Sequence, residues 1–533
     1  MKQTLTLLTL TFILLSTHVQ AAEFHVSTSE AFQAALATAA NNGGDDTIFL
    51  AAGMYYGNFR YLANEANALT IQTEDGLIPG EVILDGGKLA YVLMIGAENL
   101  EANFNLLGIQ FQNGNGINGG GLSIHTNGVI VIKDCYILDN ISSEKGCAIF
   151  VTKASNIFFI NNIVKGINKN YNKNDKSLIY ISYCSNITFT GNDIDGAGTL
   201  DYGNGSGIYI DKSSSVLLYD NKIYRNFDRY NNMAGVSINS CSTITLERNN
   251  IYSNERGVYV SSSSKVTLTG NTIYRNFSDW SSTYLFSAGI NIELCSTVEL
   301  ISNCIINNIS MYGENIIYIS VSKILYLINN TISDNLNKSN SCIIFFKIPE
   351  MSGTFQIINN IIYNNRFYST TGLKYDICIE GYGEQLTAHN NIFSDAKALW
   401  TDASNNRDID PLFFDPENND FHLKPNSPCI NAGNPNAPDL PEFDLDGNPR
   451  IGLPDIGAYE FSNATTHPAD IDNNWTIDAS EFQTYNTHWK TGQLWNDTLI
   501  PINYVTIAGW IYKKGQQYGN TGAGKPQCWV PNE

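Results

Sequence analysis

Basic residues are scarce in this chain of 533 residues. It holds 31 Lys and Arg against 51 Asp and Glu, and its formal net charge at pH 7 is −20. Nucleic-acid binding depends on basic side chains that neutralise phosphates, so this balance argues against a nucleic-acid partner. It also disfavours anionic lipids and acidic polysaccharides, unless a local basic patch or a bridging cation intervenes.

Long hydrophobic runs are missing as well. The apolar stretch from Leu5 to Leu15 is far shorter than the roughly 20 residues that span a bilayer. It follows Lys2 and precedes small and polar residues that end at Ala21, which is typical of a secretory signal peptide over residues 1–21. We therefore expect an exported protein, secreted or at the cell surface, with no membrane span in the mature chain.

Charged residues make up only 15% of the chain, whereas hydrophobic residues make up 43%. A chain of this length and composition can bury a large core and is not disordered. Its 43 Gly and 29 Tyr favour many turns and a β architecture.

The dominant pattern is an internal repeat of the form Asn-x-Ile. Its isoleucines are Ile163, Ile194, Ile223, Ile251, Ile273, Ile305, Ile332, Ile361 and Ile392. The asparagines two residues earlier are Asn161, Asn192, Asn221, Asn249, Asn271, Asn303, Asn330, Asn359 and Asn390. Between them lie short alternating segments such as 207–210 and 216–218, and alternation with period two indicates strands.

Three short strands in a repeat of about 22 residues, stacked about 4.8 Å apart, describe a parallel β-helix. We expect each asparagine to bond to those in the turns above and below, because backbone groups in that turn would otherwise be unpaired. The repeats are too rich in Asn and β-branched residues for a helical solenoid. The sequence therefore predicts an all-β solenoid.

Eight of the ten cysteines lie within the repeats. Cys184, Cys241 and Cys295 occupy the position that Ser213 and Ser263 hold in the intervening turns, which predicts small stacking residues. Successive members lie two turns apart, about 10 Å, which is too far for a disulfide.

Two cysteines, Cys429 and Cys528, lie outside the repeats, and the sequence leaves a bridge between them open. At the other end of the chain, Ser27 to Glu30 has the spacing of a capping box. It predicts an amphipathic helix through Phe32 and Leu36 that ends at the Gly43-Gly44 pair and caps the solenoid.

This helix, the segments 46–50 and 53–57, and the Asn-x-Ile turns together resemble the pectin-lyase-like superfamily. The resemblance covers about residues 23–461 and implies a right-handed parallel β-helix over 22–393. The segments 410–413, 426–433, 444–450 and 455–460 resemble the closing part of bacterial secreted β-helix proteins, which implies a C-terminal cap over 394–461. The superfamily includes lyases, hydrolases, epimerases and adhesins, so the resemblance implies a fold and not one activity.

The long insertions all fall at one corner of the repeat, before the Gly-containing strand, and predict a wall on one side of the solenoid. They are residues 164–177, 195–206, 224–234, 274–288 and 362–376. The aromatic residues that we assign to this wall are Tyr171, Tyr202, Phe227, Tyr230, Trp280, Tyr284, Phe286, Phe367 and Tyr368. The outward column of the next strand is Tyr180, Tyr209, Ser237, Tyr259, Asn291 and Tyr318.

Rings and amides in this arrangement suit a long polar polymer such as a glycan, although the loop aromatics would equally pack against one another. The candidate substrate-binding residues are Tyr180, Tyr209, Tyr259, Trp280 and Tyr318.

Glycans are cleaved by hydrolysis or by β-elimination, and the two reactions need different side chains. Hydrolysis needs paired carboxylates about 5 to 10 Å apart. Asp211 and Glu293 share an outward position but lie three turns apart, about 14 Å, whereas Asp193 and Asp195 would lie about 7 Å apart. The alternative for that second pair is ordinary surface charge.

β-Elimination from a uronate needs a basic residue and a group that neutralises the carboxylate, for which the superfamily's lyases typically use Ca²⁺. Acidic Asp201, Asp211 and Asp228 and basic Lys212, Arg225 and Arg256 offer such parts. Our catalytic candidates are Asp211, Lys212 and Arg256, and a lyase is favoured over a hydrolase if the protein is an enzyme. No lyase or polygalacturonase motif is recognisable in the sequence.

A polar linker, 462–469, precedes a C-terminal module over 470–533. The module opens with the spacing of an EF-hand calcium loop, whose ligands would be Asp470, Asp472, Asn474, Thr476, Asp478 and Glu481. Trp475 replaces the usual Gly, no entering helix is evident, and a second loop is absent, so the module resembles half of a dockerin. We expect Ca²⁺ as a cofactor and allow for a protein partner; the alternative is an acidic loop without metal.

These features predict a secreted or cell-surface β-helix that binds extracellular polysaccharide and that could also cleave it. The alternatives are an adhesin or surface-structural protein without catalytic activity, and a Ca²⁺-dependent lyase of uronate polymers. The sequence leaves the sugar open.

Overall fold

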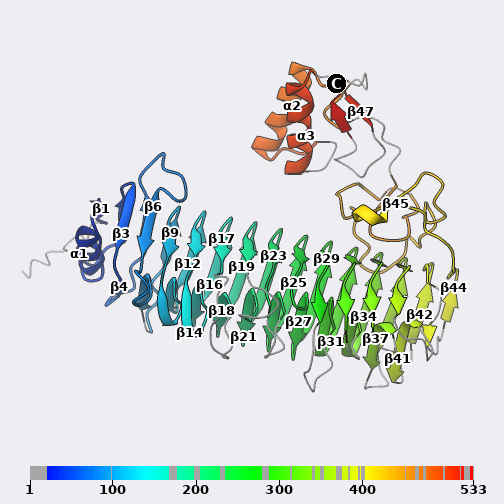
Figure 1. Cartoon of the computed structure of the whole chain (residues 1–533), viewed down its shortest axis with the longest axis horizontal. Coiled ribbons are helices and arrows are strands. Elements are labelled where there is room, and N and C mark those ends of the chain that lie inside the picture. The colour runs from blue at the N-terminus through cyan, green and yellow to red at the C-terminus, as the bar shows by residue number, and fades with distance from the viewer. Residues whose placement is uncertain are drawn as a thin grey trace, which may run out of the picture.

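The computed structural model shows a long stack of parallel strands with helix α1 (Ser29–Ala39) at its N-terminal end (Figure 1). The structure describes residues 21–97, 99–166, 177–196, 205–227, 234–278, 287–311, 315–338, 342–348, 353–367, 375–381, 385–393, 396–397, 402–450, 452–461, 467–471, 476–495, 499–515, 518–520 and 529–531.

Three rows of strands, here called faces 1, 2 and 3 in chain order within a turn, make up the solenoid. Face 1 contains β4 (Phe59–Leu62), β7 (Leu93–Ala97), β11 (Leu122–Thr126), β15 (Ile149–Thr152), β18 (Ile179–Ser182), β21 (Ile208–Asp211), β24 (Val236–Asn239), β27 (Val258–Ser261), β37 (Cys342–Ile348), β41 (Tyr375–Gly381) and β43 (Ala396–Lys397).

Face 2 contains β1 (Glu23–Val26), β2 (Asp46–Leu50), β5 (Leu69–Thr73), β8 (Phe104–Leu107), β12 (Val129–Lys133), β16 (Asn156–Ile160), β19 (Asn186–Thr190), β22 (Ser215–Tyr219), β25 (Thr243–Glu247), β28 (Lys265–Thr269), β38 (Thr354–Ile358), β42 (Gln385–His389) and β44 (Asp402–Ser404). The long strands β31 (Ile290–Ile301) and β34 (Ile317–Ile328) run through both faces and join them into one sheet of 26 strands.

Face 3 is a separate sheet of 12 strands: β3 (Gly53–Tyr56), β6 (Val82–Asp85), β9 (Gln110–Gln112), β13 (Tyr136–Leu138), β17 (Ile163–Lys165), β20 (Asp193–Asp195), β23 (Lys222–Tyr224), β26 (Asn250–Tyr252), β29 (Thr272–Tyr274), β32 (Cys304–Ile306), β35 (Thr331–Ser333) and β39 (Ile361–Tyr363). Short strands add edges at the corner before face 1: β10 (Asn115–Asn118), β14 (Ile141–Lys145), β30 (Phe277–Ser278), β33 (Ile309–Ser310), β36 (Leu336–Asn337) and β40 (Arg366–Phe367).

All strands of faces 1 to 3 pair in parallel with those of the next turn, which confirms the predicted β-solenoid. Inward residues such as Ile194, Ile223 and Ile251 are fully buried in one continuous apolar core. The chain therefore turns about one long hydrophobic axis and leaves its alternate side chains outside.

A ladder of buried asparagines holds the corner between faces 2 and 3. Its members are Asn162, Asn192, Asn221, Asn249, Asn271, Asn303, Asn330, Asn360, Asn391 and Asn406. The Oδ1 of Asn249, for example, accepts from both the backbone N (3.0 Å) and the Nδ2 (2.9 Å) of Asn221. Each turn thus satisfies the polar groups of its neighbour.

The predicted register of this ladder is wrong by one residue in three turns. Asn161, Asn359 and Asn390 hold left-handed backbone, with φ of 53°, 60° and 55°, and the asparagine after each enters the ladder. Accordingly, Ile163 is 37% exposed whereas Val164 is buried. Where the sequence reads Asn-Asn, the Asn-x-Ile pattern alone does not tell the two apart.

A second ladder, which the sequence analysis missed, closes the opposite end of face 3. It consists of Asn226, Asn254, Asn276, Asn308, Asn335 and Asn365. Each lies five residues after a member of the first ladder, as Asn254 follows Asn249. This constant spacing is the sequence signal that would have revealed it.

The cysteines of the repeat are buried, as predicted, and burial raises the pKa of the Cys184 thiol to about 12. The backbone N of Cys184 donates to the Ser213 hydroxyl at 3.2 Å, so the two residues do stack in adjacent turns. A disulfide joins Cys342 to Cys378, a pair the sequence analysis did not identify. The Cys429 thiol is unbridged, and Cys528 lies outside the described residues.

Helix α1 packs its buried face, including Phe32 and Leu36, into the solenoid core. Its N-cap is Thr28, whose hydroxyl accepts from the backbone N of Ala31, and not Ser27 as the capping-box spacing suggested. The box fails because Ala31, at the N3 position, has no side chain that could reach back to the cap.

The solenoid continues beyond residue 393, through β44 to a bridge between Ile392 and Arg407. The segment that follows, 410–461, was expected to close the C-terminal end. It instead folds back along the flank of the solenoid, over face 3 (Figure 1). Its contacts run to residues 126 to 128 positions earlier, such as the Asn329 Nδ2 bonds to the carbonyls of Asp455 (2.9 Å) and Gly457 (3.1 Å).

Within this segment, β45 (Phe413–Asp415), a 3₁₀ turn (Pro416–Asn418) and β46 (Asp420–Leu423) form a small hairpin. Its His422 lies between two carboxylates, at 2.5 Å from Asp420 and 2.6 Å from Asp446. Burial alone would lower the pKa of His422, but Asp446 and Asp420 raise it to about 10. The imidazolium therefore ties the hairpin to the Asp446 turn at neutral pH.

The C-terminal part of the chain has its own core, around Ile477, Tyr485, Ala508 and Trp529. Its elements are α2 (Ala479–Thr491), α3 (Ile502–Lys513), β47 (Tyr518–Asn520) and β48 (Trp529–Pro531).

We predict that Asn249→Ala destabilises the solenoid by about 2 kcal/mol or more, because it leaves buried donors of Asn221 without an acceptor. The measurement is the midpoint of urea unfolding. Asn186→Ala, at an exposed asparagine pair on face 2, is the control and should move the midpoint by far less. Equal shifts for the two variants would contradict this role of the ladder.

We also predict that His422→Asn lowers the thermal midpoint most below pH 6.5. A histidine whose pKa is raised on folding contributes its full stabilisation below its unfolded pKa of about 6.5 and loses it as the pH rises through about 10. The gap between wild type and variant should therefore shrink between about pH 6 and pH 10.5. His25→Asn, at an exposed position, is the control, and a gap independent of pH would refute the prediction.

Candidate functional site

The outward column that the sequence predicts on face 1 exists in the structure. Strand pairing places Tyr180, Tyr209, Ser237, Tyr259, Asn291 and Tyr318 side by side in successive turns. Tyr180 is 8% exposed, and Tyr209, Tyr259 and Tyr318 are half-buried. The repeat thus aligns one side chain per turn at a spacing of about 4.8 Å.

Aromatic stacking extends the column by one residue at each end. Phe150 stacks on Tyr180 at 5.6 Å and Tyr180 on Tyr209 at 5.2 Å, while Phe345 stacks on Tyr318 at 5.8 Å. Lys145 Nζ donates to the Tyr180 hydroxyl at 2.9 Å. The sequence analysis missed Phe150 and Phe345, which occupy the same alternate position in their strands.

Trp280 and most aromatic residues of the insertions lie outside the described residues. The exceptions are Phe227, whose ring lies 5.6 Å from that of Phe277, and Phe367, which packs against the solenoid core. These two rings therefore pack within the protein, as the alternative to ligand binding predicts.

A polar column runs beside the rings, at the end of each face 1 strand. Asp211, Asn239, Ser261 and Glu293 occupy it in successive turns. Asn239 donates to Asp211 at 2.9 Å, and the Ser261 hydroxyl donates to Asn239 at 2.7 Å. Face 1 therefore offers rings and hydrogen-bonding groups in two parallel rows.

Two of the three catalytic candidates, Asp211 and Lys212, lie together. Lys212 Nζ is 3.6 Å from the Asp211 carboxylate and donates to the Tyr183 hydroxyl at 3.2 Å. The Tyr183 hydrogen bond and the charge of Asp211 raise the pKa of Lys212. An exposed lysine held in its protonated form is poorly suited to act as a general base.

The third candidate, Arg256, lies at the opposite end of the face. It is 3% exposed and lies at the corner before β27, with φ of 66°, whereas Asp211 ends β21, so the length of a face 1 strand lies between the two positions. The structure therefore does not bring Arg256 together with Asp211 and Lys212.

The carboxylate pair considered for hydrolysis lies on face 3. Asp195 is 3% exposed and its carboxylate binds the Arg225 guanidinium, whose Nε donates to Oδ1 at 2.8 Å. Because this carboxylate is buried and engaged by Arg225, Asp195 is poorly placed to donate a proton to a bound sugar. Asp201 and Asp228 lie outside the described residues.

The predicted calcium loop is described only in part, since Asp472 and Asn474 lie outside the described residues. Asp470 and Glu481 are buried, at 3% and 7% exposure. Glu481 accepts from the backbone N of Ile471 (2.7 Å) and of Asp478 (3.0 Å), and Asp478 caps helix α2. Thr476 precedes that helix, and the described residues alone hold no cluster of three metal-binding side chains.

No helix within the described ranges has the length and apolar character needed to cross a bilayer.

Comparison with protein families gives one match. The family model described as "Right handed beta helix region" matches residues 120–297 and 177–393, which together cover more than half of the chain. No curated protein matches the sequence.

Several solved structures match this chain at low similarity. A pectate lyase matches with a TM-score of 0.35 and 13% identity, over 84% of this chain and 98% of that one. A DFA-IIIase from Arthrobacter chlorophenolicus A6 gives 0.36 and 12%, over 71% and 98%, and a family 28 exopolygalacturonase from Yersinia enterocolitica gives 0.28 and 10%, over 65% and 74%. Similarity at this level carries no argument about the activity of this chain.

The parallel pairing, the buried asparagine ladders and the family match lead to one conclusion. The chain belongs to the right-handed β-helix family.

Proposed function

We propose that this protein binds an extracellular polysaccharide along face 1. The observation that carries the proposal is the pair of in-register columns, one of rings and one of polar side chains. A polymer of repeating sugar units presents apolar C–H faces and hydroxyl groups at regular intervals, and rings beside amides and carboxylates complement both.

The state of the tyrosines supports this assignment. Burial, followed by the charges of Glu293 and Glu380, raises the pKa of Tyr318. Burial likewise raises the pKa of Tyr259, against a hydrogen bond from Ser261 and with a smaller effect of Glu293. Both phenols therefore remain neutral, and able to donate and accept hydrogen bonds, in the physiological range.

Three features support, in turn, binding without cleavage, an uncharged polymer and export of the protein. Arg256 lies far from Asp211 and Lys212, and Lys212 is held protonated, which disfavours β-elimination by this trio. The net charge of −20 disfavours a uronate polymer. The disulfide between Cys342 and Cys378 supports export, since such bonds persist in oxidising compartments.

We further propose that the C-terminal module binds one Ca²⁺ through the loop from Asp470 to Glu481. The support is the ligand spacing, together with the two buried carboxylates at its first and last positions and the helix that begins at Ala479. The ion would hold the ligands of the loop together. The hydrogen bonds between Asp478 and Glu481 fix the end of the loop where helix α2 begins.

Tyr209→Ala combined with Tyr259→Ala should weaken polysaccharide binding at least tenfold, because two rings of the column are lost. The measurement is retardation of the full-length protein in native gels that contain neutral or uronate polysaccharides. Tyr56→Ala removes a 65%-exposed ring on face 3 and should leave retardation unchanged.

Two results would overturn the binding proposal. One is that no polysaccharide retards the wild type. The other is Ca²⁺-dependent release of unsaturated ends from a uronate polymer, followed by absorbance, which would identify a lyase.

Asp470→Ala combined with Glu481→Ala should abolish the uptake of one Ca²⁺ per full-length chain in calorimetry. The exposed acid Glu417, changed to Ala, is the control and should leave the stoichiometry at one. An unchanged stoichiometry in the double variant would refute the loop assignment, independently of the result for face 1.

A further inference from the structure

One corner of the solenoid departs from an otherwise uniform design. Between faces 2 and 3, eleven of the twelve turns place two residues between the strands, as Asp220 and Asn221 do between β22 and β23. The exception is the turn between β5 and β6, where residues 74–81 form an eight-residue loop. Because the repeat does not require this insertion, the loop is a local addition to the solenoid.

The loop is held in place by its own contacts. Leu77 packs against the solenoid core, and the backbone N of Ile78 donates to the Glu81 carboxylate at 2.9 Å. Gly80 lies against Tyr136 of β13, two turns further along, where an added Cβ would be 3.6 Å from the ring. The loop therefore overhangs the following turns.

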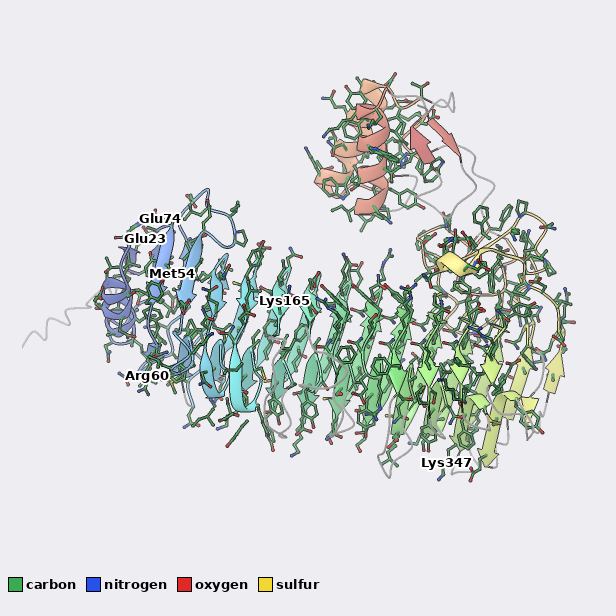
Figure 2. All side chains as sticks on the ribbon, viewed as in Figure 1. Glu23, Met54, Arg60, Glu74, Lys165 and Lys347 are labelled. Atoms are coloured by element: carbon green, nitrogen blue, oxygen red, sulfur yellow. A yellow bond between two sulfur atoms is a disulfide. The ribbon has the colours of Figure 1, made fainter. Side chains whose placement is uncertain are left out.

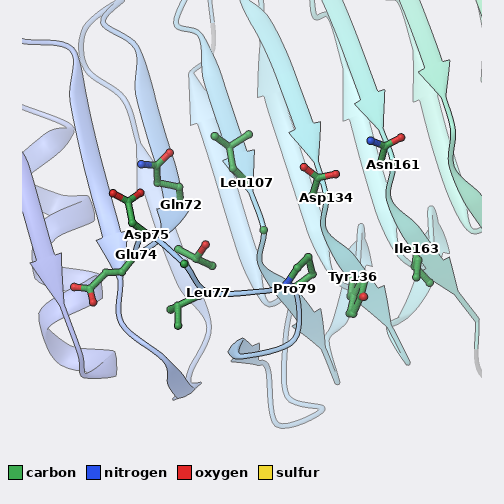
Figure 3. A pocket seen from close by; sticks show the side chains of 13 residues that line it. Gln72, Glu74, Asp75, Leu77, Pro79, Leu107, Asp134, Tyr136, Asn161 and Ile163 are labelled. Atoms are coloured by element: carbon green, nitrogen blue, oxygen red, sulfur yellow. The ribbon is translucent and has the colours of Figure 1, made fainter. Parts of the chain in front are cut away.

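A cavity of about 530 Å³ lies between this loop and the corners of the next turns (Figure 3). Its lining residues are Gln72, Thr73, Glu74, Asp75, Gly76, Leu77, Pro79, Leu107, Gly108, Asp134, Tyr136, Asn161 and Ile163. Figure 3 shows that these side chains come from the loop and from the ends of successive strands. This volume is in the range of small-molecule sites and suits one ring-sized ligand.

The lining combines an aromatic ring with hydrogen-bonding groups of several kinds. Within the described ranges Tyr136 stacks on no other ring, since its neighbours on face 3 are Gln110 and Ile163. The Gln72 and Asn161 amides both donate and accept, and the Asp75 and Asp134 carboxylates accept. An aromatic ring can pack against the apolar C–H face of a sugar, and the acceptors can bind its hydroxyl groups.

The charge of the cavity narrows the ligand class. Three carboxylates, Glu74, Asp75 and Asp134, line it, and no lysine or arginine is among its lining residues. Lys133 lies 3.8 Å from Asp134 but outside the lining, so the lining itself is negative. A uronate, a phosphate or a sulfate would be repelled, whereas an uncharged sugar would gain charge-assisted hydrogen bonds.

We infer that this cavity is a second carbohydrate site, which binds a single uncharged hexose ring, either free or at the end of a chain. It is separate from the column on face 1. In Figure 2, Glu74 at the cavity and Lys347 on face 1 lie on opposite sides of the solenoid. A long polymer on face 1 and a short sugar unit in the cavity would therefore bind independently.

Saturation-transfer NMR on the full-length protein tests the inference. The probes are the methyl glycosides of glucose, galactose and mannose, the free uronates of glucose and galactose, and short neutral oligosaccharides. We expect transfer to at least one neutral glycoside and none to the uronates. Transfer to the glycosides identifies a single ring as the ligand, and transfer confined to the terminal ring of the oligosaccharides identifies a chain end.

Variants locate the site. Tyr136→Ala and Asp75→Asn should each weaken binding at least tenfold, and both positions are partly exposed or exposed, so folding should persist. Replacing residues 74–81 with the Asp-Asn pair of a standard corner should abolish binding. Tyr56→Ala is the control and should bind the probe as the wild type does, while Tyr209→Ala reports any contribution of face 1 to the signal.

Several outcomes would overturn the inference. They are the absence of transfer to any neutral probe, equal transfer to the uronates, or unchanged binding in Tyr136→Ala. Loss of binding in Tyr209→Ala with retention in Tyr136→Ala would assign the signal to face 1 instead, so failure of this site and failure of the proposed function remain distinguishable.

Discussion

Buried backbone groups at the corners of the coil are the constraint on which this structure depends. A solenoid with tight corners carries N–H and C=O groups that cannot pair within a strand, and each would destabilise the fold if left unpaired. Asparagine meets this need because its amide both donates and accepts, so Asn221 can satisfy one neighbour and be satisfied by Asn249. Two such ladders, at the two ends of face 3, hold successive turns in one register.

That fixed register determines where recognition can occur. Since every corner between faces 2 and 3 except one has two residues, outward side chains are forced into columns one strand spacing apart. A column can differ from turn to turn in chemistry but not in position, which suits a repeating ligand such as the polymer proposed for face 1. The one long corner, 74–81, interrupts this regularity and borders an open cavity, which suits a small ligand. Regular and irregular parts of the same coil thus favour ligands of different size.

The periodic part of the fold is readable from the sequence, because each turn repeats the same physical requirement. The strands, the buried cysteine column and the outward position of Tyr209 and Tyr259 follow from spacing alone. The predicted register is wrong where two adjacent residues satisfy the same pattern, as at Asn161 and Asn162. Only burial distinguishes the ladder residue, Asn162, from Asn161, which has left-handed backbone. The prediction fails for contacts between distant segments, such as Asn329 with Asp455, which no local period encodes. The cavity was missed for the same reason, because the loop and Tyr136 meet only across turns.

The same geometry is the reason that we propose binding, and not hydrolysis, for the described part of face 1. Paired carboxylates for glycoside hydrolysis must lie about 5 to 10 Å apart, which corresponds to one or two turns of the coil. In the polar column, Asp211 and Glu293 are separated by Asn239 and Ser261 and therefore lie three turns, or about 14 Å, apart. Asn239 donates to the Asp211 carboxylate, and the Ser261 hydroxyl donates in turn to Asn239. An array of acceptors and amides fixed in this way can orient sugar hydroxyls along several turns. Within the described polar column, however, no second carboxylate lies close enough to Asp211 to form the pair that hydrolysis requires.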